Sequence, residues 1–193
     1  MSPRPERENL THILRRMAAG DRTAASAALE EVYPELRQRA ERLLAREHLA
    51  GSMTPSALVN ELWLQKLRNL QVELNDRTHF FRLCARGMRQ ILKDRARLRV
   101  TLKRQRDKDV ATTMSQFAAR PSALEPEDAL SIDEALDALG ETDPRVVAVV
   151  EVKFYLGCTW DETGEHLGIH PSEARRDWDY AQAWLKSRLS SSK

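Results

Sequence analysis

Helical periodicity is clearest in RTHFFRLCARGMRQILKDRARLR, residues 77–99. Drawn as a helix with 3.6 residues per turn, this segment carries two separate stripes of side chains. The apolar stripe consists of Phe80, Phe81, Cys84, Met88, Ile91 and Leu92. The basic stripe consists of Arg82, Arg86, Arg89, Lys93 and Arg97. The pattern predicts a long amphipathic helix from about Thr78 to Arg99.

The rest of the chain also favours helix over sheet. Leu, Ala, Arg and Glu are abundant, and aromatic residues make up only 6% of the 193 residues. The β-branched run VVAVVEVKFY, residues 146–155, resembles a buried strand by propensity alone. Asp143-Pro144 before it is typical of a helix start, and helical segments flank it, so we interpret it as helix. The sequence therefore predicts an all-α protein.

Several classes of protein are excluded by simple features of the sequence. No run of 18 apolar residues is present, and the N-terminus MSPRPERENL has no apolar signal-peptide core, so we expect a cytoplasmic protein without membrane insertion. Cys84 and Cys158 form no CxxC pair, and His166 and His170 are separated by Gly168 without a third ligand in register. Glycine-rich phosphate loops and GxSxG are absent. We expect no catalysis, no metal and no cofactor.

Charge is distributed very unevenly along the chain. Residues 77–108 hold 12 Lys/Arg and 2 Asp/Glu, a net charge of +10, whereas residues 109–143 hold 1 Arg and 9 Asp/Glu, a net charge of −8. Like charges at helical spacing repel, so a basic stripe is easiest to explain if it meets a polyanion. We interpret the stripe as a nucleic-acid contact. The alternative is an ordinary solvated helix surface.

A second candidate DNA-binding element lies near the C-terminus. Residues 160–167 and 171–189 are predicted to be two helices joined by a tight turn, with Thr159 as a cap and Gly168 in the left-handed turn conformation. Gly164 would allow close approach of the second helix. In helix-turn-helix units the start of the second helix enters the major groove. The exposed candidates there are Ser172, Glu173, Arg175 and Arg176. A purely structural helix pair stays open.

The order of these parts resembles a short sigma factor of the extracytoplasmic-function (ECF) class. The resemblance extends from about Leu10 to Leu189. It depends on VYPELRQRAERLL (32–44), TPSALVNELWLQKL (54–67), residues 77–99 and HPSEARRDWDYAQAWL (170–185) together. It implies an N-terminal helical bundle at 8–100, a flexible linker at 101–128 and a C-terminal helix-turn-helix bundle at 129–189.

The resemblance also implies partners and site residues. The protein would bind core RNA polymerase at its clamp and flap and direct transcription from promoter DNA. The first domain would hold and help melt the minus-ten element, and the second would bind the minus-thirty-five element through Ser172, Glu173, Arg175 and Arg176. The residues implied for the minus-ten element are Arg77, His79, Arg82, Arg86, Arg89, Lys93 and Arg97. Those implied for the clamp are Leu58, Asn60, Glu61, Leu64 and Leu67.

One segment departs from the sigma-factor pattern. Related proteins usually carry acidic residues just before the LVNE-like segment, where this chain has Thr54-Pro55-Ser56-Ala57. A phosphate on Thr54 or Ser56 would add about 1.5–2 negative charges at a helix N-terminus. We therefore consider control by a Ser/Thr kinase beside control by an anti-sigma factor. The alternative is that Thr54 is an ordinary helix cap.

Two other functions remain to be compared with the sigma-factor hypothesis. A stand-alone helix-turn-helix regulator would bind duplex DNA without polymerase. A nuclease would use the acidic residues at 161–165, but no metal cluster can be assembled around them from the sequence.

Overall fold

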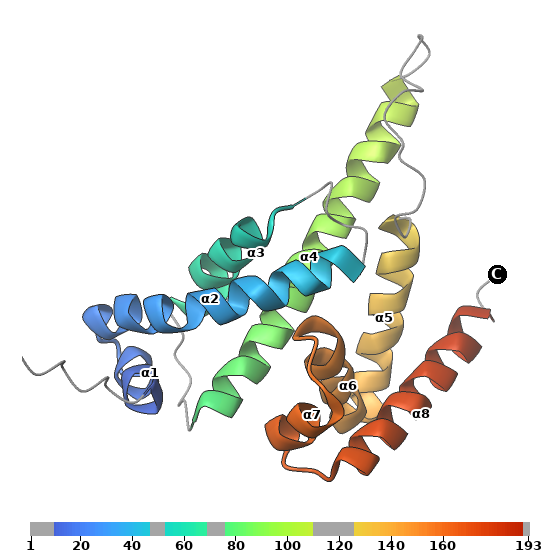
Figure 1. Cartoon of the computed structure of the whole chain (residues 1–193). Coiled ribbons are helices and arrows are strands. Elements are labelled where there is room, and N and C mark those ends of the chain that lie inside the picture. The colour runs from blue at the N-terminus through green and yellow to red at the C-terminus, as the bar shows by residue number, and fades with distance from the viewer. Residues whose placement is uncertain (1–9, 47–52, 69–75, 110–125, 191–193) are drawn as a thin grey trace, which may run out of the picture.

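The computed structural model describes residues 10–46, 53–68, 76–109 and 126–190. Within these ranges the chain is helical and contains no strand, in agreement with the predicted fold class (Figure 1). The elements are α1 (Leu10–Ala18), α2 (Arg22–Arg46), α3 (Pro55–Leu62), the π-helical segment η2 (Trp63–Leu67), α4 (Arg77–Asp109), α5 (Pro126–Thr142), α6 (Pro144–Val150), the π-helical segment η3 (Glu151–Tyr155), α7 (Trp160–Leu167) and α8 (Pro171–Ser190).

Helix starts in the first half are set by short polar residues. Asp21 Oδ1 accepts hydrogen bonds from the backbone N–H groups of Thr23 and Ala24, at 2.9 and 3.1 Å, where α2 begins. Gly20 before it has φ of 91°, which favours glycine. Thr54 Oγ1 accepts a hydrogen bond from Ala57 N at 3.1 Å and caps α3.

Helix α4 is longer than the sequence periodicity predicted. It continues to Asp109, whereas the prediction ended at Arg99 and assigned 101–128 to the linker. Lys, Arg and Gln in this extension have good helix propensity even without an apolar stripe, which explains the difference. Helix α5 likewise begins at Pro126, earlier than the predicted 129, with proline at its first position. Residues 110–125 of the expected linker lie outside the described ranges.

The β-branched run at 146–155 is helical, which confirms the interpretation against its strand propensity. Pro144 begins α6, and the π-helical η3 completes the element. Asp143 occupies the N-cap position but its side chain makes no capping hydrogen bond, so the reason for the helix differs in part from the one expected. Four valines of α6 are buried, and this tertiary burial outweighs local propensity.

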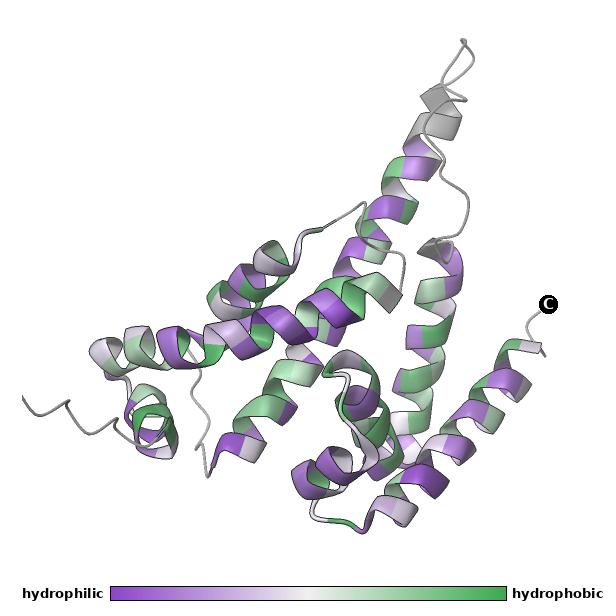
Figure 2. Cartoon of the chain, viewed as in Figure 1, coloured by the Kyte–Doolittle hydropathy of each residue, from purple (hydrophilic) through white to green (hydrophobic). Residues whose placement is uncertain are grey.

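The two halves of the chain pack against each other through α4. This helix runs between α1–α3 on one side and α5–α8 on the other (Figure 1). Val152, Leu156 and Cys158 join the buried core of the first half. The second half also has an apolar cluster of its own, formed by Leu136, Leu139, Val146, Val147, Val150 and Ala181. The helices carry both hydrophobic and hydrophilic residues, as expected for amphipathic elements (Figure 2).

Candidate nucleic-acid interface

Burial divides the basic stripe of α4 into two parts. Arg82, Arg86 and Arg97 are exposed, whereas only 9% of Arg89 and 8% of Lys93 is accessible. All five residues share one side of the helix, so the difference arises from what packs on it. The elements that contact α4 beside Arg89 and Lys93 are α5 and η3.

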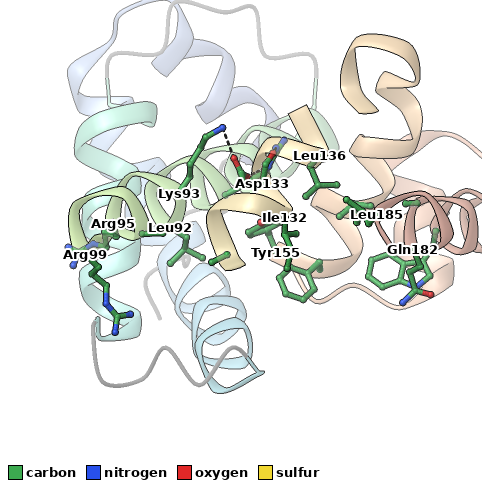
Figure 3. A pocket seen from close by; sticks show the side chains of 17 residues that line it. Leu92, Lys93, Arg95, Arg99, Ile132, Asp133, Leu136, Tyr155, Gln182 and Leu185 are labelled. Carbon is green, nitrogen blue, oxygen red and sulfur yellow. Dashed lines mark hydrogen bonds and ion pairs between the residues drawn. The ribbon is translucent and has the colours of Figure 1, made fainter. Parts of the chain in front are cut away.

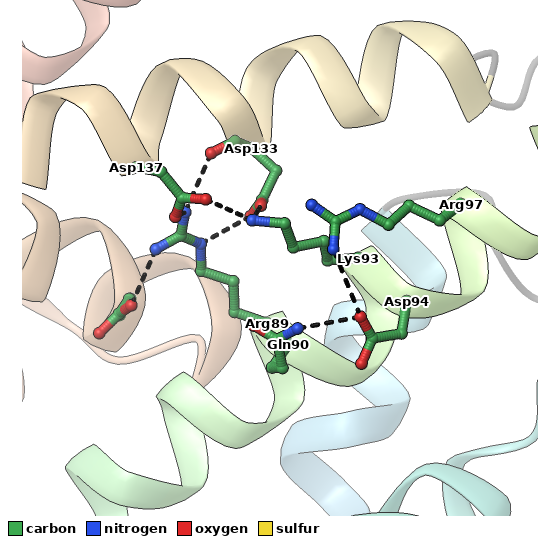
Figure 4. Close-up of polar contacts among 8 residues, drawn as sticks. Arg89, Gln90, Lys93, Asp94, Arg97, Asp133 and Asp137 are labelled. Atoms are coloured by element: carbon green, nitrogen blue, oxygen red, sulfur yellow. Dashed lines mark hydrogen bonds and ion pairs between the residues drawn. The ribbon is translucent and has the colours of Figure 1, made fainter.

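Arg89 is held by three carboxylates from the second half of the chain (Figure 4). Its Nε donates to Asp133 Oδ1 at 2.7 Å, and its Nη2 donates to Asp137 Oδ1 at 2.7 Å and to the Asp133 carbonyl oxygen at 3.1 Å. Its Nη1 donates to Glu151 Oε1 at 3.1 Å. Lys93 Nζ pairs with Asp133 Oδ2 at 2.5 Å and also with Asp137. The cluster therefore neutralises two cations that the sequence assigned to DNA.

Burial and nearby cations act in opposite directions on the acids of this cluster. Burial raises the pKa of the Glu151 carboxyl above its usual value, although Arg89 opposes the shift. Burial also acts to raise the pKa of Asp137, but the hydrogen bond from Lys93 and the charge of Arg89 lower it overall. Of these two carboxyls, the more exposed Asp137 therefore ionises at the lower pH.

The start of α4 contributes further residues to the candidate minus-ten surface. Asp76 Oδ1 accepts a hydrogen bond from the His79 backbone N–H at 2.7 Å and so orders the first turn. Arg77 is half-exposed; it pairs with Glu35 and lies over the Phe81 ring, 4.8 Å from its centroid. Phe80 and Phe81 are fully buried, so they belong to the core and cannot stack on bases in this conformation.

Arg39 links the two halves at a second polar contact, which the sequence did not reveal. Its Nη1 donates to the Leu156 carbonyl oxygen at 3.1 Å and to Cys158 Sγ at 3.2 Å. Its Nη2 donates to Glu35 Oε1 at 2.7 Å. Only 7% of Arg39 is accessible. The sequence indicates this role only indirectly, because Arg39 occupies a position of α2 at which the apolar pattern predicts a core residue.

Helices α7 and α8 form the predicted helix-turn-helix. Thr159 and Glu162 make a reciprocal capping box at the start of α7, and Gly168 has φ of 65° in the turn. A Cβ on Gly164 would lie 2.6 Å from the carbonyl oxygen of Ile169, so the turn approaches α7 closely. The predicted cap and both glycine roles are confirmed.

The candidate DNA-reading residues lie on the outer side of α8. Arg175 and Arg176 are exposed; Arg175 lies over the Trp160 ring, 5.3 Å from its centroid. Glu173 Oε2 accepts a hydrogen bond from the His170 backbone N–H at 3.1 Å, and Ser172 Oγ lies 2.7 Å from His170 Nδ1. Ser172 and Glu173 thus also order the first turn of α8, while the two arginines project toward solvent.

The residues expected to face the polymerase clamp fall into two sets. Leu58 and Leu67 are buried in the core, whereas Asn60 and Leu64 are exposed. Glu61 is partly exposed and pairs with Arg95 of α4 at 2.7 Å. Of the five predicted clamp residues, Asn60, Glu61 and Leu64 are therefore accessible on α3 and η2.

Thr54 and Ser56, the candidate phosphorylation sites, lie at the start of α3. Thr54 is exposed and Ser56 is half-buried. The first turn of α3 contains no acidic residue, as the sequence indicated. Elsewhere in the described ranges, no three His, Cys, Asp or Glu side chains are grouped as a metal site would require.

Sequence reasoning missed the acids that cover the basic stripe. Asp133, Asp137 and Glu151 were assigned no role, although the net charge of −8 directly after a segment of +10 was visible. That pattern is compatible with an internal contact as well as with a nucleic-acid contact. The burial of Arg89 and Lys93 shows that the internal contact forms in this structure.

Comparison with known proteins gives one family. The family model described as ECF sigma factor matches residues 7–191. No curated protein matches the chain. In the part of the chain that the structure describes, no helix is both long enough and apolar enough to cross a membrane.

Proposed function

The chain belongs to the ECF sigma factor family, and we propose that it binds core RNA polymerase and opens promoter DNA at the minus-ten element. The coarser conclusion, a DNA-binding regulator that directs transcription through RNA polymerase, follows from the family. A stand-alone regulator that acts without polymerase is not favoured by the family match. In the proposal the protein works in the cytoplasm and performs no catalysis of its own.

The observation that carries this proposal is the length of the family match, which includes both candidate DNA-binding elements. In the first half, the exposed residues Arg82, Arg86 and Arg97 would hold the phosphates of the melted minus-ten strand. In the second half, Arg175 and Arg176 would contact the minus-thirty-five duplex in the major groove. Asn60, Glu61 and Leu64 would contact the polymerase clamp.

Run-off transcription tests the proposal directly. Purified core polymerase is combined with the protein and a genomic promoter library, and new transcript starts are mapped. We expect starts that require the protein, each preceded by two short elements at a constant spacing. If the protein bound duplex DNA but no transcript start depended on it, the sigma-factor function would be contradicted.

The same proposal includes control by phosphorylation at Thr54, for which Ser56 is the second candidate. A phosphate on Thr54 would lie at the N-terminus of α3, where the helix dipole and the N–H groups of the first turn favour an anion. It would supply the negative charge that this turn lacks. The opposing explanation, that Thr54 acts only as a cap, agrees equally with its hydrogen bond to Ala57.

Thr54 variants separate these two explanations. We expect kinase-phosphorylated protein and Thr54→Glu to bind core polymerase more tightly than Thr54→Ala in a pull-down at fixed salt, by about tenfold for each 1.4 kcal/mol gained. Ser26→Glu adds the same charge to an exposed position of α2 and serves as the control. Equal polymerase binding by all forms would leave Thr54 as a cap alone.

A further inference from the structure

The part of the basic stripe nearest the second half is covered by the chain's own acidic helix. Carboxylates of Asp133 and Asp137 on α5 approach Arg89 and Lys93 as closely as phosphate oxygens would, with nitrogen-to-oxygen distances of 2.7 Å at Arg89. The side chains of Arg89, Lys93 and Asp133 are each 10% accessible or less. DNA cannot reach these cations while α5 lies on α4.

We propose that α5 is a self-inhibitory surface: Asp133 and Asp137, with Glu151 of η3, occupy the cations of α4 that the promoter strand needs. The described structure is then the closed form of the protein, and the active form requires α5 to leave α4. The inference rests on the proposed function, because it takes the basic stripe as the DNA contact. It adds a competitor for that contact within the same chain.

Two cations of α4 meet three carboxylates of the second half of the chain. Arg89 is bound by three separate carboxylates, and Lys93 shares two of them (Figure 4). Arg89 and Lys93 occupy the centre of the basic stripe, between Arg86 and Arg97. A polyanion and α5 would therefore compete for one set of cations, and occupancy by either excludes the other.

The remainder of the contact is suited to reversible opening. Beside the charged cluster, α4, α5, η3 and α8 line a pocket of about 370 Å³ that is partly open to solvent. Its walls include Leu92, Ile132, Leu136, Tyr155 and Leu185 (Figure 3). Side chains that line an open pocket have fewer dispersion contacts than side chains in a packed core, and desolvation offsets much of the attraction within buried ion pairs.

Opening would also leave each half with a core. The apolar cluster around Leu139 and Val147 belongs to the second half alone. Opening must also break the contacts of Val152, Leu156 and Cys158 with the first half, the packing of η3 and α7 on α4, and the hydrogen bonds of Arg39. Competing DNA and polymerase contacts are the available source of that free energy.

Neutral substitutions on α5 test the inference in the full-length protein without polymerase. The test variant is Asp133→Asn with Asp137→Asn. The control is Glu134→Gln with Glu141→Gln, which makes the same change in net charge at two exposed positions of the same helix. Small-angle scattering measures the radius of gyration, and fluorescence anisotropy measures affinity for a mixed-sequence single-stranded DNA 20-mer. Circular dichroism confirms that both variants keep their helix content.

We expect the test variant to have a larger radius of gyration and to bind the oligonucleotide about tenfold more tightly than the control, since the closed form no longer competes. Glu151→Gln neutralises only the carboxylate that accepts from Arg89 Nη1, so it is expected to shift both readouts in the same direction by less. It also provides the test if the double variant loses helix content.

Two results would overturn the inference. Radius and affinity indistinguishable from the control would mean that α5 does not hold the protein closed. An enlarged radius without tighter DNA binding would mean that the covered cations are not a DNA contact. Failure of the proposed function is seen separately, as the absence of protein-dependent starts in run-off transcription with the unaltered chain.

Discussion

Replacing Arg82 and Arg86 together by alanine is expected to reduce run-off transcription about ten- to hundredfold while leaving core polymerase association unchanged. Both side chains are exposed on the basic stripe of α4 and are not covered by α5. The net contribution of a hydrogen bond at such exposed positions is about 0.5–1.5 kcal/mol, so losing two costs roughly 1–3 kcal/mol, and 1.4 kcal/mol corresponds to about tenfold. Promoter opening is measured by permanganate reactivity of unpaired thymines, and polymerase association by pull-down.

The salt dependence of DNA binding gives an independent readout of this pair. Log affinity falls with log salt concentration, and each lost contact to a single-stranded phosphate is expected to make this negative slope shallower by about 0.7. The control is Arg37→Ala with Arg42→Ala, which removes the same charge from exposed positions of α2. If the two double variants open promoters equally well, the exposed part of the stripe is only a solvated surface.

Replacing Gly164 by alanine is expected to destabilise the helix-turn-helix and to weaken minus-thirty-five binding. The new Cβ would lie 2.6 Å from the Ile169 carbonyl oxygen and 3.3 Å from Pro171 Cδ, so the turn between α7 and α8 must move. Overpacking of this kind costs about 1–3 kcal/mol, which exceeds the gain of roughly 1 kcal/mol that alanine has over glycine within a helix. Thermal unfolding followed by circular dichroism measures the loss of stability.

Gly140→Ala is the matched control for this variant. Its Cβ would lie 3.6 Å from Val147 Cγ2, an ordinary contact, so this substitution in α5 is expected to be neutral or slightly stabilising. A melting temperature for Gly164→Ala equal to that of Gly140→Ala would show that the turn adjusts without cost. Duplex binding then distinguishes a displaced α8 from a correctly placed one.

Local chemistry made some elements predictable from the sequence. Thr54, Thr159 and Gly168 act within a few residues of themselves: two hydroxyls accept hydrogen bonds from nearby N–H groups, and a glycine adopts the left-handed conformation. Such features depend on residues that are close together in the chain, so the sequence is enough to predict them. The helix-turn-helix was predictable for this reason.

The end of α4 and the helical state of residues 146–155 were harder to predict from the neighbouring sequence. Charged residues continue α4 to Asp109 without an apolar stripe, so periodicity ended the predicted helix too early. Four buried valines of α6 adopt helix because they pack in the core, although their propensity favours strand. In the second case the correct interpretation depended on the flanking segments.

Residues close together in the chain were enough to predict the helical fold class, the caps and turn of the C-terminal helix pair, and a strongly positive stripe before a strongly negative segment. The packing of distant helices settles which of those positive charges face solvent and which face Asp133, Asp137 and Glu151. A helical repeat assigns each side chain to one side of its own helix, but burial depends on the partner helix that covers that side. That partner is encoded more than 40 residues away from Arg89.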